Sequence, residues 1–417
     1  MPPRRRHVLS SKVAFIVLIL SLCAWVRRRV FLTPVLSDSL FPPSALRTAA
    51  APGARRHGDS FFVEIVSPSV HRASNAHEGL PRVLVLTPVK NAYRHLDRFF
   101  SALRNFSYPP HLLSLGIMDS DSEDKPSAAL LSELLAPSSL AALGMTAEDI
   151  AAVRPSGTLA KELLEAPRLV RDAGWRRAIV ARHDFGYALN TGMRHAENVQ
   201  GQRREVLARS RNHLLSLALE DEDWVLWLDS DLRWQPTDAL ERLLAAASAR
   251  VGSRSHHPAR QIIVPNCVMK LGGGRSYDLN SWRGPHGSPG DNATAEEVIA
   301  YHERTFNEKG VLLQGYKAQG SRYLNHFKRR AKGAPPDVSG RKDTTVWLDA
   351  DAIDNSVVRL DAVGGAMLLV YAELHRHGLI FPPFAYRHRI ETEGLSMMAL
   401  DMGVLSWGMP FLEVLHN

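Results

Sequence analysis

The sequence predicts an α/β protein with a mainly parallel sheet. Short apolar segments alternate with segments of helical periodicity from residue 82 onward. Acidic residues follow several of the apolar segments, at the carboxyl ends of strands, where open α/β sheets bind ligands. A chain of 417 residues, 45% of them hydrophobic, is long enough to bury one large core or two smaller ones. Strands joined by helices of this length are typical of right-handed βαβ units.

The expected elements follow one another through this segment. Strands are predicted at residues 83–86, 113–118, 178–181, 225–228, 262–265, 367–371 and 411–415. Helices are predicted at residues 96–103, 206–219, 238–249 and 395–402. Thr87 and Pro88 are expected to break the first strand. Residues 126–174 suggest extra helices or an insertion loop, and residues 284–340 a long loop over a site.

The most informative motif is the aspartate pair Asp229 and Asp231. It follows the apolar run Trp224–Leu228, which predicts a fully buried strand. Because alternate side chains of a strand share a face, both carboxylates can point to one position. Hard divalent cations such as Mg²⁺ and Mn²⁺ prefer oxygen ligands of this kind. The pair also suits a capping role before the next helix, where Pro236 fits the first turn.

The N-terminal residues predict a membrane anchor followed by a stem. Residues 13–26 are almost all apolar, but a typical spanning helix needs about 20 residues. The basic side chains on both flanks can extend toward the membrane surface, so that this shorter run could still cross a thin bilayer. A cleaved signal peptide is the alternative, with Ser21 and Cys23 before the cut, but three arginines directly after the run favour an uncleaved signal anchor. The predicted organisation is a cytoplasmic tail at 1–12, an anchor helix at 13–26, a flexible stem at 27–81 and a folded domain at 82–417.

Charge and cysteine content exclude several classes of protein. The net charge of +8 arises from residues 1–60, and the rest of the chain is formally neutral, so a basic nucleic-acid surface is not expected. The two cysteines, Cys23 and Cys267, leave no disulfide framework and no cysteine-based zinc site in the folded body. Sequons at Asn105 and Asn292 permit N-glycosylation of a luminal domain.

Several short sequence blocks across residues 82–417 form a series that can be compared with known families. They are LVLTPVKN at 84–91, DFG at 184–186, RSRN at 209–212, WLDSD at 227–231, YDLNSW at 277–282, VGG at 363–365, IETEG at 390–394 and LH at 415–416. In this order the blocks resemble the fungal Golgi α-1,6-mannosyltransferases of mannan polymerase complexes, glycosyltransferase family 62. The resemblance implies a GT-A fold, GDP-mannose as donor, a Mn²⁺-type ion (or Mg²⁺), type II membrane topology and a luminal Golgi domain.

The resemblance also implies which residues bind metal and donor. It adds His416 as a third metal ligand beside Asp229 and Asp231. Arg209, expected at the start of a helix, offers a planar fork suited to the pyrophosphate, although a solvated helix face would also explain it. The full set of expected nucleotide contacts is Thr87, Pro88, Asn91, Asp119, Asp184, Arg209 and Asn212.

Three carboxylates are candidates for catalysis. Glu391 and Glu393 fall in the first turn of a predicted helix, where the helix dipole alone would favour carboxylates. Near the sugar they would instead stabilise the cationic anomeric carbon or orient the acceptor hydroxyl. Asp361 is the third candidate. An α-linked donor and product imply retention, which leaves a covalent intermediate and same-face attack both open.

The expected function is a retaining, metal-dependent mannosyltransferase of the Golgi membrane. It transfers mannose from GDP-mannose to an α-mannoside acceptor, in a hetero-oligomer with related subunits. The alternative is a non-catalytic nucleotide-sugar-binding subunit of such a complex. A phosphohydrolase of the haloacid dehalogenase type is disfavoured, because Arg233 stands where those enzymes usually carry Thr or Val.

Overall fold

The structure, a computed structural model, describes residues 47–48, 61–66, 79–123, 173–187, 197–248, 258–272, 275–285, 287–306, 321–327 and 357–416. All of them belong to one compact unit, Leu46–Asn417. The predicted anchor at 13–26 and residues 126–172 of the 126–174 segment lie outside the described residues. Within the described part of the chain, no helix is long and apolar enough to cross a membrane.

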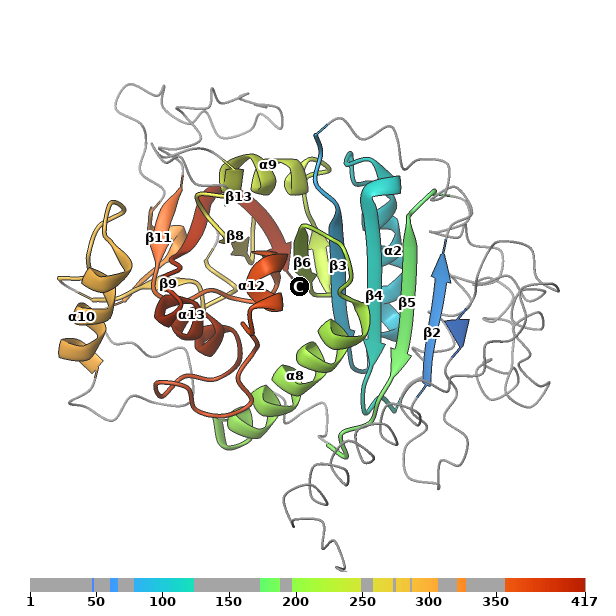
Figure 1. Ribbon diagram of the computed structural model, residues 1–417, viewed down its shortest axis with the longest axis horizontal. Helices are drawn as coiled ribbons and strands as arrows, with labels where there is room; N and C mark the ends of the chain where they lie inside the picture. Colours follow the sequence, from blue (N-terminus) through green and yellow to red (C-terminus); the bar gives the residue numbers. More distant parts are fainter. Residues whose placement is uncertain are drawn as a thin grey trace, which may run out of the picture. The chain divides into compact units, whose positions relative to one another are not determined.

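One large sheet organises the described residues (Figure 1). Its strand order is β1-β2-β5-β4-β3-β6-β12-β8-β13-β11, with β7 beside β13. The strands are β1 Arg47–Thr48, β2 Phe61–Val66, β3 Val83–Val89, β4 Leu113–Asp119, β5 Arg177–Arg182, β6 Trp224–Leu228, β7 Leu232–Trp234, β8 Ile262–Val268, β11 Val358–Leu360, β12 Met367–Tyr371 and β13 Ser406–His416. A separate ribbon pairs β9 Trp282–Arg283 with β10 Arg322–Tyr323.

Helices cover both faces of this sheet. They are η1 Tyr93–His95, α2 Leu96–Arg104, η2 Pro110–Leu112, α8 Glu197–Ala218, α9 Ala239–Ser248, α10 Ala295–Phe306, η4 Leu324–Phe327, α12 Ala372–Arg376 and α13 Glu391–Asp401. Buried residues of α2 and α9 pack in one core cluster, and those of α8 and α13 in the cluster on the other face. Gly116 of β4 lets α8 approach closely, since an added Cβ would lie 3.2 Å from the Cβ of Ala218. The α/β class is therefore confirmed.

The prediction of a mainly parallel sheet is wrong, because antiparallel pairings outnumber parallel ones among the described strands. Strands β5, β4, β3 and β6 are parallel to one another, and so are β8 and β13. Strand β12 runs antiparallel to both β6 and β8. An apolar run such as Met367–Tyr371 does not reveal its direction, because a strand buried on both faces has the same composition in either orientation. The sheet is therefore mixed.

All of the strands and helices predicted within the described residues are present, with changed limits. Strand β3 continues through Thr87 and Pro88 to Val89. The missing N–H of Pro88 is tolerated because β6 pairs only with residues 83–86 of β3. Helix α8 begins at Glu197, well before the predicted start at residue 206.

Two segments predicted to lack regular structure contribute elements. Strands β1 and β2 fall inside the predicted stem at 27–81, and β2 pairs antiparallel with β5. Helix α10 and strand β10 fall within 284–340, where a long loop is predicted. Sheet pairing therefore begins before the predicted domain boundary at residue 82.

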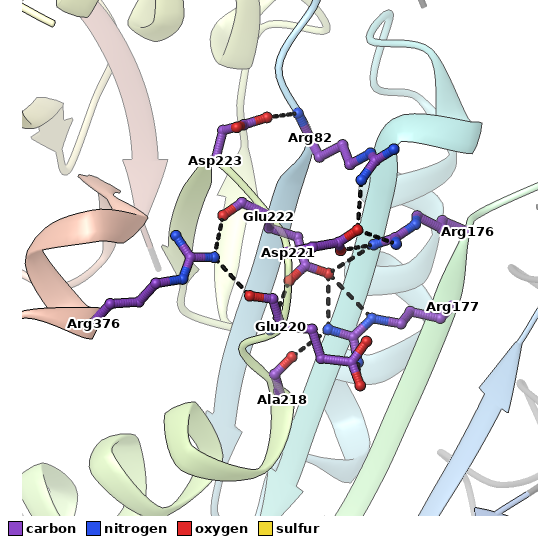
Figure 2. Close-up of polar contacts among 9 residues, drawn as sticks. All are labelled: Arg82, Arg176, Arg177, Ala218, Glu220, Asp221, Glu222, Asp223 and Arg376. Carbon is purple, nitrogen blue, oxygen red and sulfur yellow. Dashed lines mark hydrogen bonds and ion pairs between the residues drawn. The ribbon is translucent and has the colours of Figure 1, made fainter. Parts of the chain in front are cut away.

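A charged cluster ties the starts of the parallel strands together, at the end opposite the aspartate pair (Figure 2). The acidic turn between α8 and β6 supplies Glu222, whose side chain is 0% exposed and accepts a hydrogen bond of 2.8 Å from Arg177. Arg176 pairs with Asp221 at 2.6 Å, and Arg376 of α12 donates to the Glu222 carbonyl at 2.7 Å. These bonds fix where β5 and β6 begin, and hence where they end at the site.

Candidate metal and nucleotide site

The aspartate pair and His416 meet at the carboxyl end of β6. Asp229 directly follows β6, and its N–H donates to the carbonyl of Ala366 at 2.9 Å. Strand β7 then runs antiparallel to β13, so that Leu232 lies opposite His416. One ligand atom from each of Asp229, Asp231 and His416 lies within 4.8 Å of the others. The strand order thus assembles three metal-ligand side chains from residues far apart in sequence.

His416 is held firmly in place. Its Nε2 lies 2.9 Å from Oδ1 of Asp231, and its ring stacks on Tyr277 with centroids 3.6 Å apart and planes at 9°. Although burial lowers the pKa of His416, the hydrogen bond and charge of Asp231 raise it overall. A penultimate residue fixed in this way can serve as a ligand once it loses its proton.

Arg211 lies behind the pair, on the α8 side. Its guanidinium is 2% exposed, donates to Asp229 at 3.4 Å and forms an ion pair with Glu391. Gly365 leaves room for it, because an added Cβ there would collide with the guanidinium. Burial raises the pKa of Asp229 to about 6, with Arg211 opposing this shift and Asp231 adding to it.

Asp278 adds a fourth carboxylate near the cluster. Its side chain lies where a Cβ on Gly364 would stand, and its Oδ1 accepts from the N–H of Asn280 at 3.0 Å. Burial raises the pKa of Asp278, with the charges of Arg204 and His416 acting in the opposite direction. The two glycines of the VGG block therefore make room for Asp278 and for Arg211.

A cavity of about 610 Å³ opens from the aspartate pair along the sheet edge. Its walls come from the end of β3 with the turn after it, from the end of β4, from Tyr187 and from α8. Residues that contribute side chains include Pro88, Lys90, Asn91, Ser120, Glu123, Tyr187, Arg203, Ser210, Asp229 and Asp231. This volume is in the range of small-molecule sites.

Of the expected nucleotide contacts, Pro88 and Asn91 line the cavity. Asn91 adopts φ 50°, and its side-chain oxygen accepts from the N–H of Glu123 at 2.8 Å. Thr87 is fully buried within β3. Asp119 ends β4 and is paired with Arg182 at 3.2 Å. Asp184 accepts from the N–H of Asp121 at 2.8 Å, so these two aspartates brace the strand ends next to the cavity.

The structure places Arg209 and Asn212 away from the cavity walls. Arg209 lies in the middle of α8, not at its start, and its side chain is 52% exposed and paired with Glu205. Asn212 donates to the carbonyl of Phe381 at 2.7 Å and accepts from its N–H at 2.9 Å. Arg203, nearer the start of α8, lines the cavity instead.

The three candidate catalytic carboxylates are buried, and none lines the cavity. Glu391 begins α13 at φ 61° and pairs with Arg211, so one guanidinium separates it from Asp229. Glu393 accepts from Arg204 at 3.2 Å and from the Trp282 indole at 2.9 Å.

Asp361 belongs to a different cluster. It accepts from the N–H of Gly284 at 2.6 Å and pairs with Arg359, and His302 lies 3.1 Å away. Burial opposes ionisation of Asp361, but the hydrogen bond of His302 and the charge of Arg359 lower its pKa well below the usual range. Asp361 therefore anchors the segment that leads into α10.

The donor set fits a hard divalent cation. Two carboxylates and one imidazole reach a common point, and oxygen donors predominate, as Mn²⁺ and Mg²⁺ prefer. Cys267 is nearby, but burial raises the pKa of its thiol and keeps it protonated. The fold and the site thus define an α/β protein that can hold a divalent cation beside an open cavity.

The chain belongs to the Anp1 family, whose model matches residues 67–385. It is 28% identical over 345 residues to the mannan polymerase II complex anp1 subunit of Schizosaccharomyces pombe, covering 80% of this chain and 64% of that one. It is also 28% identical over 380 residues to the mannan polymerase complex subunit mnn9 of the same yeast, covering 91% and 92%. The predicted family is therefore confirmed.

Solved structures give a looser match. The mannosyltransferase PcManGT of Pyrobaculum calidifontis, solved with GDP-Man and Mn²⁺, overlaps with a TM-score of 0.34 at 12% identity, over 83% of this chain and 62% of that one. Staphylococcus aureus TarS 1-349 overlaps with a TM-score of 0.33 at 11% identity, over 80% and 59%. At TM-scores this low, the overlaps fix neither the fold family nor the substrate.

Proposed function

We propose that this protein is a retaining, metal-dependent mannosyltransferase of the GT-A type. It transfers mannose from GDP-mannose to an α-mannoside acceptor. The observation that carries the proposal is the Asp229–Asp231–His416 cluster, which opens on a cavity of about 610 Å³ at the carboxyl ends of parallel strands. The names of several relatives, which are subunits of mannan polymerase complexes, support mannose as the sugar.

The chain's own residues have distinct parts in this reaction. Asp229, Asp231 and His416 would hold Mn²⁺ or Mg²⁺, which supplies neutralising charge for the leaving diphosphate. Arg203, on the cavity wall, offers a guanidinium fork to phosphate oxygens in place of Arg209. Arg211 stays behind Asp229 and orients its carboxylate through a 3.4 Å hydrogen bond.

Among the three carboxylates, Glu391 is the best candidate to act near the sugar. It lies at the positive end of α13 and shares Arg211 with the metal ligand Asp229, whereas Glu393 and Asp361 pair with other arginines. Retention of configuration requires either a carboxylate nucleophile or attack from the face of the leaving group. Full turnover by Glu391→Gln would remove Glu391 from both schemes.

A second candidate function is a non-catalytic nucleotide-sugar-binding subunit. The observation favouring it is the engagement of all three carboxylates with buried arginines, away from the cavity walls. Purified protein that binds GDP and Mn²⁺ but transfers no mannose to an α-mannoside would favour this candidate.

The cellular setting forms part of the same proposal. We place the protein in the Golgi membrane with type II topology, anchored by residues 13–26, and in a hetero-oligomer with related subunits. The relatives named as subunits of mannan polymerase complexes support the assembly. Protease protection of the C-terminal domain in sealed Golgi vesicles tests the topology; digestion without detergent would contradict it.

The donor is tested by a screen of GDP- and UDP-sugars, with and without Mn²⁺. We expect transfer from GDP-mannose only, and only with the metal. Transfer from UDP-sugars alone would overturn the proposed donor.

A further inference from the structure

Tyr187 is fixed in position through its backbone and its ring. Its N–H donates to Oδ1 of Asp121 at 3.0 Å, and its carbonyl accepts from the ammonium of Lys90. The same ammonium lies 5.1 Å from the centre of the Tyr187 ring. Asp121 is held in turn, because its own N–H donates to Asp184 at 2.8 Å. The acidic residues that follow β4 and β5 thus hold this tyrosine against the cavity.

The hydroxyl of Tyr187 is the part of this residue that has no partner. The side chain is 7% exposed and lines the cavity, and its hydroxyl has no hydrogen-bond partner among the described residues. Buried hydroxyls are normally paired, since an unpaired one loses its hydrogen bonds to water without replacement. Burial raises the pKa of Tyr187, with the charge of Arg203 opposing, so the hydroxyl keeps its proton and can donate.

Tyr187 and the two aspartates of the metal cluster line the same cavity. Asp229 directly follows β6, whereas Tyr187 lies beyond the end of β5, with β4 and β3 between these two strands in the sheet. The carbonyl and ring of Tyr187 lie against Lys90, which follows β3, so Tyr187 reaches back across the strand ends. With a diphosphate at the metal cluster, the nucleoside therefore extends along the cavity that Tyr187 lines.

Two charged side chains line the cavity together with Tyr187. Lys90, a cationic hydrogen-bond donor, lies 5.1 Å from the centre of the tyrosine ring, and Glu123 is an anionic acceptor. A nucleobase with a ring carbonyl beside a ring N–H, such as guanine, can accept from the Tyr187 hydroxyl and donate to a carboxylate. Adenine, with an amino group and an unprotonated ring nitrogen at these positions, cannot do both.

We propose that the Tyr187 hydroxyl donates a hydrogen bond to the ring carbonyl of the donor's nucleobase and so selects an oxo base over an amino base. This inference rests on the proposed function, in which the donor is a GDP-sugar. Lys90 acts as a positioning residue, because it holds the tyrosine carbonyl and covers the ring.

The test is Tyr187→Phe in the full chain, titrated calorimetrically with GDP, ADP and pyrophosphate in the presence of Mn²⁺. We expect GDP affinity to fall about tenfold, as for the loss of one hydrogen bond, and the affinities for ADP and pyrophosphate to stay unchanged. Thermal unfolding of the ligand-free variant should occur at the wild-type temperature or above, because the lost hydroxyl had no protein partner. A hydroxyl with only a structural role would instead lower the unfolding temperature when removed and leave GDP affinity unchanged.

A matched control is Tyr386→Phe, whose hydroxyl donates to Asp401 at 2.7 Å outside the cavity. Its GDP affinity should equal that of the wild type. Unchanged GDP affinity in Tyr187→Phe would overturn the inference, and so would an equal loss for GDP and pyrophosphate, which would move the contact to the phosphates. Failure of the wild-type protein to bind GDP at all would instead overturn the proposed function along with the inference.

Discussion

Replacing Glu393 by glutamine separates a structural role from a catalytic one. Glu393 and Arg204 are both 2% exposed, and the carboxylate accepts from Arg204 at 3.2 Å and from Trp282 at 2.9 Å. Glutamine preserves the shape but removes the negative charge. The buried guanidinium of Arg204 then loses its anionic partner and keeps the neutral Asn280 at 3.0 Å.

The expected loss of stability is large. Removing one partner of a buried ion pair costs about 3–5 kcal/mol, because the remaining charge stays buried without compensation. Glutamine retains one oxygen that can accept from Trp282 or Arg204, so we expect a value near the lower end, about 3 kcal/mol. Glu393→Leu combined with Arg204→Met, which removes both charges, should recover part of this loss.

The assay is urea unfolding followed by tryptophan fluorescence. The control is Glu205→Gln, which breaks the exposed pair with Arg209 (side chains 35% and 52% exposed) and should cost less than about 1 kcal/mol. An unchanged unfolding midpoint in Glu393→Gln, together with lost mannose transfer, would refute the structural role and return Glu393 to the reaction.

The remaining predictions concern the site and the sheet. Arg203→Ala should weaken Mn²⁺-dependent GDP binding by about tenfold or more, as for the loss of one charge-assisted hydrogen bond. Arg209→Ala should leave GDP binding unchanged. Equal losses of GDP affinity in the two variants, measured by calorimetry, would contradict the assignment of Arg203 to the phosphates. Metal affinity should fall as the pH drops through about 6, because the raised pKa of Asp229 lets that ligand take up a proton there. The metal-free protein should gain slightly in stability over the same range, because its folded state binds this proton more tightly than the unfolded chain does. A Mn²⁺ affinity that stays constant from pH 7.5 to 5 would contradict this. Glu222→Gln should destabilise the protein by about 3 kcal/mol, since it removes the buried carboxylate 2.8 Å from Arg177 and leaves the exposed Glu220 at 3.7 Å. A urea unfolding midpoint equal to that of the wild type would show that the cluster in Figure 2 is dispensable.

The sequence predicts the strands well because their apolar runs are buried on both faces. Trp224–Leu228 and Met367–Tyr371 are recognisable from composition alone, but their relative direction depends on the long connections between them. Strand β2 was missed because it lies in a segment without sustained periodicity and gains its place by pairing with β5.

The candidate site is predictable only in part, for a similar reason. The local spacing of Asp229 and Asp231 places both at one strand end, while His416 needed the family resemblance. The basic run on α8 does not show which side chain faces which way: Arg203 lines the cavity, and Arg204 is buried against Glu393. Nothing local marks Tyr187, because its position depends on hydrogen bonds from residues distant in sequence.

The central claim is that the metal cluster and its cavity serve transfer of mannose from a GDP-sugar. The most direct measurement is transfer of labelled mannose from GDP-mannose to an α-mannoside by the purified full chain, with Mn²⁺ and after chelation, beside Asp231→Asn. Metal-dependent transfer by the wild type, abolished by chelation and by the substitution of Asp231, is the predicted result. Transfer that persists in Asp231→Asn or without metal would contradict the account, as would Mn²⁺-dependent GDP binding without any transfer.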